Sequence, residues 1–307
     1  MTRRDFPLSL AAAALTPPVA AVPTEFAFRY MTATCLYGGM TLEEIVPELE
    51  KTGALAIDVW SSHAEPVPQR DMMERMGRTG FRQLLERYRT RLGCLTHFKL
   101  GPFGLRDEIP VAAELGGKGT LLVAGSRWPG GRPVPVTDTA GHRDAVKRFV
   151  AELGPYLELA EKHGVILALE NHSGQMLSTP DSVRWLVELE PSRALAVALS
   201  PYHLEQNPAM LARLIEDLGP RLALFYAWQH GKGSAGKMPK AHELEQLPGR
   251  GTLDFRPLVA ALQKIQYQGW TEIFMHPFPR GVPILPTVAE VTAEINRART
   301  YLEGCAL

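Results

Sequence analysis

The sequence has few cysteines, no excess of charge of either sign and no long hydrophobic run. Its 307 residues contain 33 Lys and Arg against 33 Asp and Glu, so the formal net charge is zero. A neutral chain without strongly basic segments argues against nucleic acid or an anionic membrane surface as a partner. No apolar segment approaches the roughly 20 residues that a membrane-spanning helix needs, so we expect no membrane span.

The three cysteines, Cys35, Cys94 and Cys305, lack metal-ligand spacing and are odd in number. This excludes a disulfide framework and a zinc knuckle, and we expect Cys35 and Cys94 to be buried in strands. Three nucleotide-binding and hydrolase motifs are also missing: Gly-x-Gly-x-x-Gly after the first strand, Gly-x-x-x-x-Gly-Lys-Ser/Thr, and Gly-x-Ser-x-Gly. Their absence argues against an open dinucleotide-binding sheet, a P-loop and a nucleophile elbow.

The first 21 residues differ from the rest of the chain. The pair Arg3-Arg4 precedes a short apolar run, residues 8–15, and then a stretch of prolines and small residues ending at 21. This pattern is typical of a twin-arginine signal peptide over residues 1–21, and it predicts a periplasmic or secreted protein. A leader that is not processed, in a cytoplasmic protein, is the alternative. Residues 22–307 contain no linker and are expected to form one domain.

Apolar runs typical of strands alternate with amphipathic helical segments along residues 22–307. The expected strands are 26–34, 53–60, 94–100, 119–125, 165–170, 194–200, 222–230 and 269–276. Eight such units predict an α/β fold of the (β/α)8, or TIM barrel, type, because alternating strands and helices form a parallel sheet that closes at eight strands. An open, doubly wound sheet is the alternative.

The clearest expected strand ends in Glu170-Asn171-His172. In a barrel of this type the carboxyl ends of the strands carry the chemistry, so we expect these three side chains to point into a site. The alternative is a surface glutamate flanked by polar loop residues. Other chemically capable side chains follow the remaining strands in the same way: Asp58, Trp60, His97, Lys99, His203, Gln229, His230, His276 and Arg280.

Four segments at these strand ends resemble one known family, the sugar phosphate isomerases and epimerases of the xylose-isomerase-like barrel. The segments are Leu169-Glu-Asn-His172, Ser200-Pro-Tyr-His203-Leu, Pro248-Gly-Arg-Gly-Thr-Leu-Asp-Phe255 and Tyr267-x-Gly269. The resemblance covers nearly the whole mature chain. It implies a xylose-isomerase-like TIM barrel that acts on a small-molecule sugar or polyol, and an oligomer is possible.

The resemblance also bears on a metal. Members of that family often hold a divalent ion with Glu, Asp, His and Glu from strands five to eight. Glu170 matches the first ligand, but Ser200, Ala227 and Phe274 fall at the other three positions. Two interpretations are therefore open. Either no metal is bound, or zinc, manganese, iron or cobalt occupies a different site, for which the candidate ligands are Glu170, His203, His230 and His276.

The resemblance thus implies a sugar or polyol isomerase or epimerase in which Glu170, His203 and His276 are catalytic. Asp58 is expected to bind sugar hydroxyls, Trp60 to stack on a sugar ring, and Lys99 or Arg280 to hold a phosphate or carboxylate. The full set of expected substrate contacts is Asp58, Trp60, His97, Lys99, Asn171, His172, Gln229, His230 and Arg280. Because three of the four family ligands are replaced, a non-catalytic sugar-binding protein on the same barrel is the alternative.

Overall fold

The computed structural model describes residues 26–61, 68–128, 138–229 and 239–306. Within these ranges eight strands are hydrogen-bonded side by side in sequence order, and every neighbouring pair is parallel. The strands are β1 (Met31–Ala33), β2 (Ala56–Trp60), β3 (Leu92–Thr96), β4 (Leu121–Gly125), β5 (Ile166–Glu170), β6 (Leu195–Leu199), β7 (Leu222–Ala227) and β8 (Trp270–Ile273).

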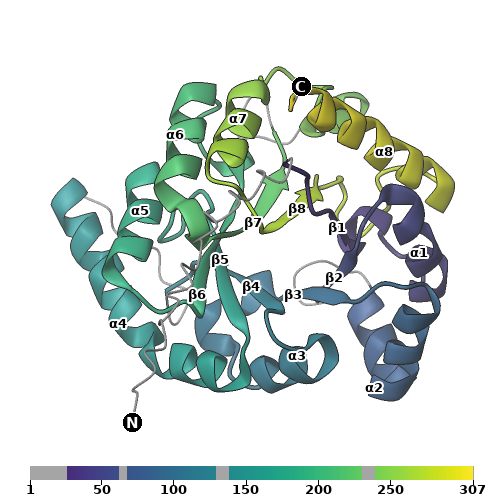
Figure 1. The fold of residues 1–307 in the computed structure, drawn as a ribbon, viewed down its shortest axis with the longest axis horizontal. Helices are drawn as coiled ribbons and strands as arrows, with labels where there is room; N and C mark the ends of the chain where they lie inside the picture. Colours follow the sequence, from purple (N-terminus) through teal and green to yellow (C-terminus); the bar gives the residue numbers. More distant parts are fainter. Residues whose placement is uncertain (1–25, 62–67, 129–137, 230–238, 307) are drawn as a thin grey trace, which may run out of the picture.

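The ring closes between the first and the last strand. The Thr271 amide donates a hydrogen bond of 2.8 Å to the carbonyl oxygen of Arg29, and Tyr30 forms a parallel bridge to Thr271. The predicted barrel is therefore confirmed, and an open sheet is excluded. Figure 1 looks into this ring and shows the helices arranged around it.

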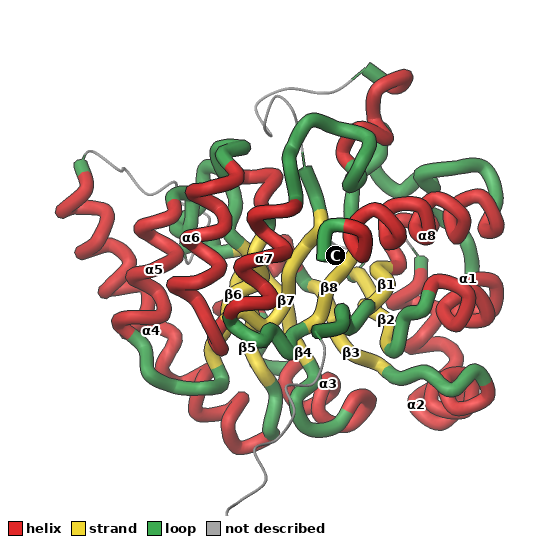
Figure 2. The backbone as a smooth tube through the Cα atoms, turned by 45° about the horizontal axis from the view of Figure 1, so that its top comes forward, coloured by secondary structure: helices red, strands yellow, loops and turns green. Residues whose placement is uncertain are grey.

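The described helices form the outer layer, and Figure 2 shows them on the outside of the strands. They are α1 (Leu42–Leu49), α2 (Gln69–Arg87), α3 (Glu108–Gly116), α4 (Thr139–His163), α5 (Pro180–Leu189), α6 (Pro208–Leu218), α7 (Arg256–Lys264) and α8 (Val288–Gly304). Among the described helices, none combines the length and the apolar character that crossing a membrane requires.

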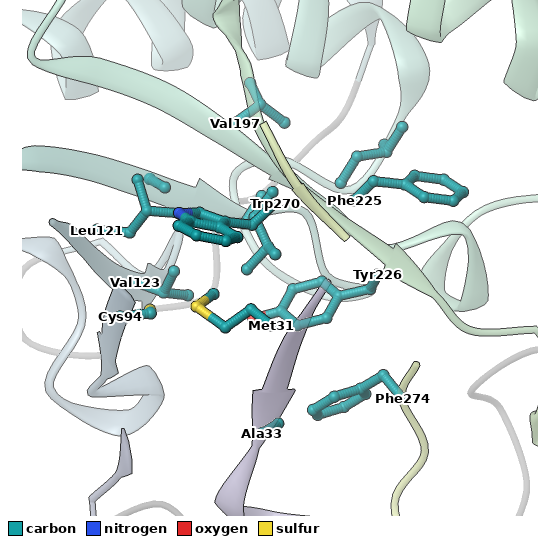
Figure 3. Close-up of a cluster of buried hydrophobic side chains, with 14 of the residues drawn as sticks. Met31, Ala33, Cys94, Leu121, Val123, Val197, Phe225, Tyr226, Trp270 and Phe274 are labelled. Carbon is teal, nitrogen blue, oxygen red and sulfur yellow. The ribbon is translucent and has the colours of Figure 1, made fainter. Parts of the chain in front are cut away.

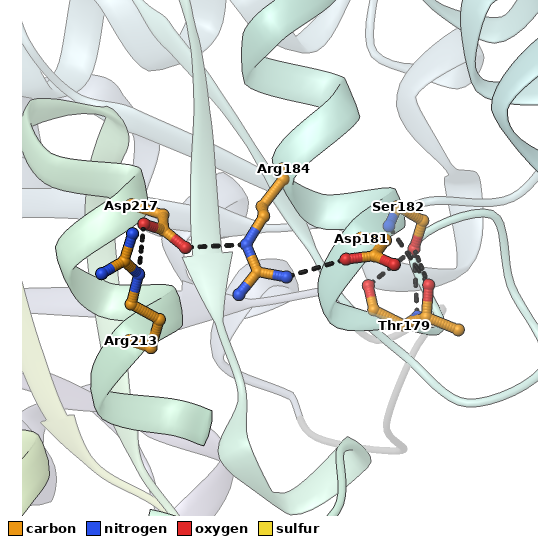
Figure 4. A network of polar contacts seen from close by, with 6 residues as sticks. All are labelled: Thr179, Asp181, Ser182, Arg184, Arg213 and Asp217. Atoms are coloured by element: carbon orange, nitrogen blue, oxygen red, sulfur yellow. Dashed lines mark hydrogen bonds and ion pairs between the residues drawn. The ribbon is translucent and has the colours of Figure 1, made fainter. Parts of the chain in front are cut away.

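Helix ends follow the local signals in the sequence. Thr41 caps α1 in a capping box with Glu44, and Gly164 ends α4 in the left-handed conformation, with φ of 70°. Both are the conformations that these residue types favour at helix ends. Thr179 likewise caps α5, as Figure 4 shows.

Figure 4 also shows how two neighbouring outer helices are joined. The Arg184 guanidinium lies between Asp181 on its own helix and Asp217 on α6, at 2.8 Å from each carboxylate. Arg213 contacts the second carboxylate from the other side, at 2.9 Å. Exposed ion pairs of this kind contribute about 0–1 kcal/mol each, so they orient α5 and α6 more than they stabilise the barrel.

The interior of the barrel is filled by side chains from alternate strand positions, as expected for a closed parallel barrel. Figure 3 shows Met31, Cys94, Tyr226 and Phe274 gathered inside the ring. All four are at most 2% exposed. Cys94 is in a strand, as predicted. Cys35 is buried, as predicted, but the prediction that it lies in a strand is wrong, because it belongs to a 3-10 helix, Thr34–Tyr37.

All eight strands differ from their predicted ranges at one or both ends, and two of the differences are instructive. The first strand is only Met31–Ala33 rather than 26–34, because the chain turns into a 3-10 helix directly after Ala33. The third strand was expected at 94–100 but is Leu92–Thr96, since Phe98–Leu100 form a 3-10 helix. The predicted signal peptide, residues 1–21, and His230 lie outside the described residues and remain predictions.

The loops after β1 and β8 meet at a position where only glycine fits. Gly38 has φ of 54°, and a Cβ atom there would overlap the backbone of Val282 and Pro283. Nearby, the Ile284 amide donates to the Leu36 carbonyl oxygen at 2.9 Å. These contacts hold the two loops together above the point at which the ring closes.

We expect Gly38→Ala to lower the free energy of unfolding by about 1–3 kcal/mol, because it adds both a strained backbone conformation and a steric overlap. Gly39→Ala is the matched control, since no atom lies within 4 Å of its Cβ position. Chemical denaturation of both variants measures the difference. Equal stabilities of the two variants would contradict the role assigned to Gly38.

Candidate active site

The carboxyl ends of the strands surround a pocket of about 210 Å³, which we call the rim pocket. Two of the side chains that line it stand at the ends of β2 and β5. The others belong to the segments that follow β3, β4, β5, β6 and β8. The full set of lining residues is Trp60, Phe98, Lys99, Arg127, Glu170, His172, His203, His276 and Arg280. This is the end of the barrel at which enzymes of this architecture place their active sites.

Glu170 is the last residue of β5. Its carboxyl group reaches the pocket, although the residue is only 3% exposed to solvent. One of its oxygens lies 3.8 Å from Nε2 of His203. Burial raises the pKa of Glu170 to about 8, an effect that the charge of Arg280 opposes and that of Asp58 reinforces. The carboxyl group is therefore largely protonated at neutral pH, although a carboxyl in water is ionised there.

Three imidazoles line the pocket beside Glu170. The rings of His172 and His203 lie against each other with centroids 3.7 Å apart and planes tilted by 34°. Burial is the main cause that lowers the pKa of each ring, to about 2 for His203 and well below the usual value for His276. All three are therefore uncharged at neutral pH, and an uncharged imidazole offers one N–H donor and one acceptor nitrogen.

The tautomer of one ring follows from its contact. Nδ1 of His172 lies 2.7 Å from the carbonyl oxygen of Ser173. Because a carbonyl oxygen only accepts hydrogen bonds, Nδ1 carries the proton and Nε2 is left as the acceptor. His172 therefore presents a basic nitrogen on the side of the ring away from its own backbone.

An aromatic group forms the floor of the rim pocket. The indole of Trp60 stacks on the Phe274 ring at 5.3 Å, and the His276 ring meets the edge of Phe274 at 4.9 Å. Behind His276, the Gln246 side chain donates to the His276 carbonyl oxygen at 2.9 Å and accepts from Nε1 of Trp228 at 3.0 Å. Gln246, which the sequence did not single out, thus positions the segment that carries His276.

The mouth of the pocket carries three exposed cations, Lys99, Arg127 and Arg280. With Glu170 protonated and the imidazoles neutral, these cations dominate the charge of the pocket at neutral pH. The site is therefore complementary to a negatively charged group. The sequence analysis did not identify Arg127 and Phe98 as pocket residues. The signal that could have found them is their place, because each lies two residues after the end of a strand.

Two of the predicted contacts lie below or beside the pocket. Asp58 is fully buried inside the barrel, where it accepts hydrogen bonds of 2.7 and 2.9 Å from the Thr96 hydroxyl. His97 was expected on the same face as Lys99, but its ring turns away and lies 3.1 Å from the Glu108 carboxylate. The 3-10 turn at Phe98–Leu100 separates the two side chains, so that only Lys99 lines the pocket.

Two further predicted contacts are used to hold the backbone. Asn171 bridges β5 and β6 through hydrogen bonds to both the amide and the carbonyl group of Ser200, at 2.7 and 2.9 Å. Gln229 holds the loop after β7 by donating to the Leu247 carbonyl oxygen at 2.7 Å and accepting from the Leu253 amide at 2.8 Å. Both amides are fully buried and do not line the pocket, so neither is placed to touch a substrate.

A second buried carboxyl lies deeper in the barrel. Glu272 is fully buried, and neither of its oxygens has a hydrogen-bond partner within the described residues. Burial, together with the nearby charges of Asp58 and Glu170, raises its pKa well above the usual value. A neutral carboxyl is the form that such surroundings favour, because an isolated buried carboxylate is costly.

The residues at the family's metal-ligand positions do not fit a divalent ion. Ser200 is buried with an unsatisfied hydroxyl, Ala227 has no donor, and Phe274 contributes an aromatic ring to the pocket floor. Across the described ranges, no group of three or more His, Cys, Asp and Glu side chains is arranged to hold a metal ion. The family's four-ligand site is therefore not reproduced by these side chains.

Comparison with known proteins supports the same architecture. A family model described as a xylose isomerase-like TIM barrel matches residues 104–297. No curated protein sequence matches the chain. Among solved structures, D-psicose 3-epimerase from Clostridium cellulolyticum H10 superposes with a TM-score of 0.65 at 15% identity, over 91% of this chain and 99% of that one.

Two other solved structures are similar to the same extent. The 3-keto-D-glucoside 4-epimerase from E. coli has a TM-score of 0.63 at 15% identity, over 89% of this chain and 100% of that one. The IOLI protein, solved with a zinc atom bound, has a TM-score of 0.69 at 14% identity, over 90% of this chain and 98% of that one. At identities this low the likeness establishes the fold.

The raised pKa of Glu170 predicts how stability depends on pH. Between about pH 4.5 and 8 the native state keeps a proton on Glu170 that the unfolded state releases, so the free energy of unfolding should fall as pH rises through this window. A one-proton difference corresponds to about 1.4 kcal/mol per pH unit. Glu170→Gln cannot ionise and should therefore show a shallower fall.

Chemical denaturation at several pH values from 5 to about 9 measures this dependence. Glu43→Gln, which changes an exposed glutamate on α1, is the control and should follow the parent protein. If Glu170→Gln lost as much stability with rising pH as the control, the carboxyl group would not be the buried neutral acid described above.

Proposed function

The chain belongs to the family of xylose isomerase-like TIM barrels, and on that premise we propose that it is an isomerase or epimerase acting on a sugar or polyol derivative. The observation that carries the proposal is the Glu170 carboxyl, which lines the rim pocket with a pKa of about 8 among uncharged imidazoles. Two of the similar solved structures are sugar epimerases, which supports the same reaction class.

In this proposal Glu170 moves the proton. A general base works best when its pKa lies close to the working pH, and a carboxylate with a pKa near 8 is a far stronger base than an ordinary one. Ionised Glu170 removes the proton from the carbon next to a substrate carbonyl and becomes the neutral acid. Isomerisation follows when Glu170 returns the proton to the former carbonyl carbon and the hydroxyl proton of the first carbon moves to the former carbonyl oxygen. Epimerisation of the first carbon instead takes a proton from a water molecule on the opposite face of the enolate, and Glu170 then gives its proton to the hydroxide that remains.

The neutral histidines are suited to a different part of the same reaction. With a pKa of about 2, His203 is too weak a base to remove a proton from carbon. Its N–H group, and that of His276, can instead donate hydrogen bonds to the oxygen that gains negative charge when the enolate forms. An imidazole that only donates a hydrogen bond can stay neutral throughout the reaction, because it transfers no proton.

We propose that the substrate carries an anionic group, a carboxylate or a phosphate. Lys99, Arg127 and Arg280 line the mouth of the pocket, and the carboxyl group that lines the same pocket is largely neutral at pH 7. The two arginines can bind either anion through paired N–H donors, whereas the lysine acts as a point charge. The same positive field stabilises the enolate, which links substrate recognition to catalysis.

We propose that the catalytic cycle does not depend on a metal ion. Support comes from the side chains at the family's ligand positions, since Phe274 and Ala227 have no donor and Ser200 has no carboxylate. The competing interpretation is a zinc, manganese, iron or cobalt site that uses Glu170 with two of His203, His230 and His276.

Elemental analysis of the purified protein separates these two interpretations. We expect substantially less than one equivalent of any transition metal, and turnover that is unchanged after dialysis against a chelator. One equivalent of metal, together with loss of turnover on chelation and its recovery on adding the ion back, would favour the remodelled metal site instead.

Replacement of the proposed base gives the direct kinetic test. On a panel of neutral sugars, sugar acids and sugar phosphates, Glu170→Gln should reduce kcat by about 10²–10⁴-fold on whichever substrate the parent turns over. Glu170→Asp keeps a carboxyl group and should retain part of the activity. For the parent protein, kcat/KM should rise about tenfold per pH unit below pH 8 and level off near pH 8, because the ionised form of Glu170 is the base.

Unchanged turnover of Glu170→Gln would rule out this role. The alternative function, a non-catalytic sugar-binding protein, has its own signature in the same panel. Sugars would then raise the melting temperature of the parent protein, yet none would be converted into product.

A further inference from the structure

A larger cavity opens at the opposite end of the barrel, where the strands begin. This basal cavity has a volume of about 450 Å³, against about 210 Å³ for the rim pocket. The first residues of several strands form its wall: Leu92, Leu121, Ile166, Leu222 and Trp270. A cavity of this size can accommodate a small organic molecule.

The charge of the basal cavity has one sign. Arg29, Arg91 and Lys118 line it, and no acidic side chain is found among its described lining residues. None of the three cations forms an ion pair with a carboxylate anywhere in the described ranges. The local field therefore favours an anion.

Two of these cations converge on one aromatic ring. The guanidinium carbon of Arg29 lies 4.4 Å from the centroid of the Trp270 ring, and that of Arg91 lies 5.1 Å from it. The indole holds both cations by cation–π attraction, but it cannot neutralise their mutual repulsion. An anion bound between them would do so. Arg29 already donates from Nη1 to the Gln268 carbonyl oxygen, which fixes its guanidinium and leaves its other N–H groups, with those of Arg91, for the anion.

Most of the remaining side chains in the wall are apolar, and Thr120, Gln266 and Gln268 are the polar ones besides Tyr267. Trp270 is 5% exposed, and Figure 3 shows its indole inside the ring together with Leu121. The hydroxyl group of Tyr267, which also lines the cavity, already donates to the Trp270 carbonyl oxygen. A ligand would therefore place an apolar or aromatic body against the strand starts and its charge against the arginines.

We propose that the basal cavity is a binding site for a small organic anion, a carboxylate or a phosphate ester with an apolar body. The site is separate from the rim pocket, because Ile166 and Glu170 stand at opposite ends of β5. Four residues of strand correspond to a separation of about 13 Å. The proposal does not depend on the reaction proposed for the rim pocket.

Isothermal titration calorimetry with three small probes tests the proposal. Phenyl phosphate and benzoate carry the two candidate anions on the same ring, and phenol is the neutral control. We expect one of the anions to bind the parent protein at one equivalent, and phenol to bind at least tenfold more weakly. The tighter of the two anions identifies the charged group that the cavity prefers.

Variants then locate the binding. Arg29→Gln and Arg91→Gln should each weaken binding of the preferred anion at least tenfold. Arg82→Gln, which removes an exposed arginine of α2 outside the cavity, is the matched control and should leave binding unchanged. Ile166→Trp keeps every cation but fills the cavity, so it should abolish binding if the ligand enters the barrel end.

Three outcomes would overturn the proposal. One is the absence of binding by either anion at millimolar concentration. Another is equal binding by the parent and Arg91→Gln, with both arginine variants folded as judged by their melting temperatures. The third is loss of binding in Arg280→Gln but not in Arg91→Gln, which would assign the anion to the rim pocket. If Ile166→Trp does not fold, the Arg29→Gln and Arg91→Gln variants still decide the question.

Discussion

Closure of the eight strands into a ring is the constraint on which the other features depend. The hydrogen bond from the Thr271 amide to the Arg29 carbonyl oxygen completes a cylinder with two distinct ends. Because all strands are parallel, every carboxyl end lies on one side, where Glu170 and the histidines gather. Every strand start lies on the other side, where Trp270 and the basal arginines meet. Arg29 contributes its backbone to the closure and its side chain to the basal cavity.

Desolvation then decides the chemistry at the rim. Burial holds Glu170 in the protonated form near neutral pH, which reverses the charge state that a carboxyl group has in water, and it keeps His203 uncharged. The cations that remain charged, such as Arg280, lie at the solvent-exposed mouth. Glu170 and His203 are thus neutral inside the rim pocket, while the cations lie at its entrance. This separation favours an anionic substrate that presents its uncharged end to Glu170.

The sequence predicted the fold more completely than it predicted the site. Each of the eight expected strands exists, and Glu170, His172, His203 and His276 do converge on one pocket. By contrast, Asn171 and Gln229 bind backbone groups and do not reach the pocket. An amide that follows a strand looks the same in the sequence whether it meets a substrate or a neighbouring loop. The distinction depends on contacts with residues far along the chain, such as Leu247 and Leu253.

What the sequence determined by itself was the order of strands and helices, and with it the end of the barrel that carries Glu170. Hydrophobic periodicity and helix caps are local properties, so they can be read from neighbouring residues. Only the tertiary structure decided that Lys99 reaches the pocket while His97 turns toward Glu108, since a single 3-10 turn redirects successive side chains. Protonation states and the basal pair of arginines were likewise decided by folding, because burial and the meeting of distant residues exist only in the closed ring.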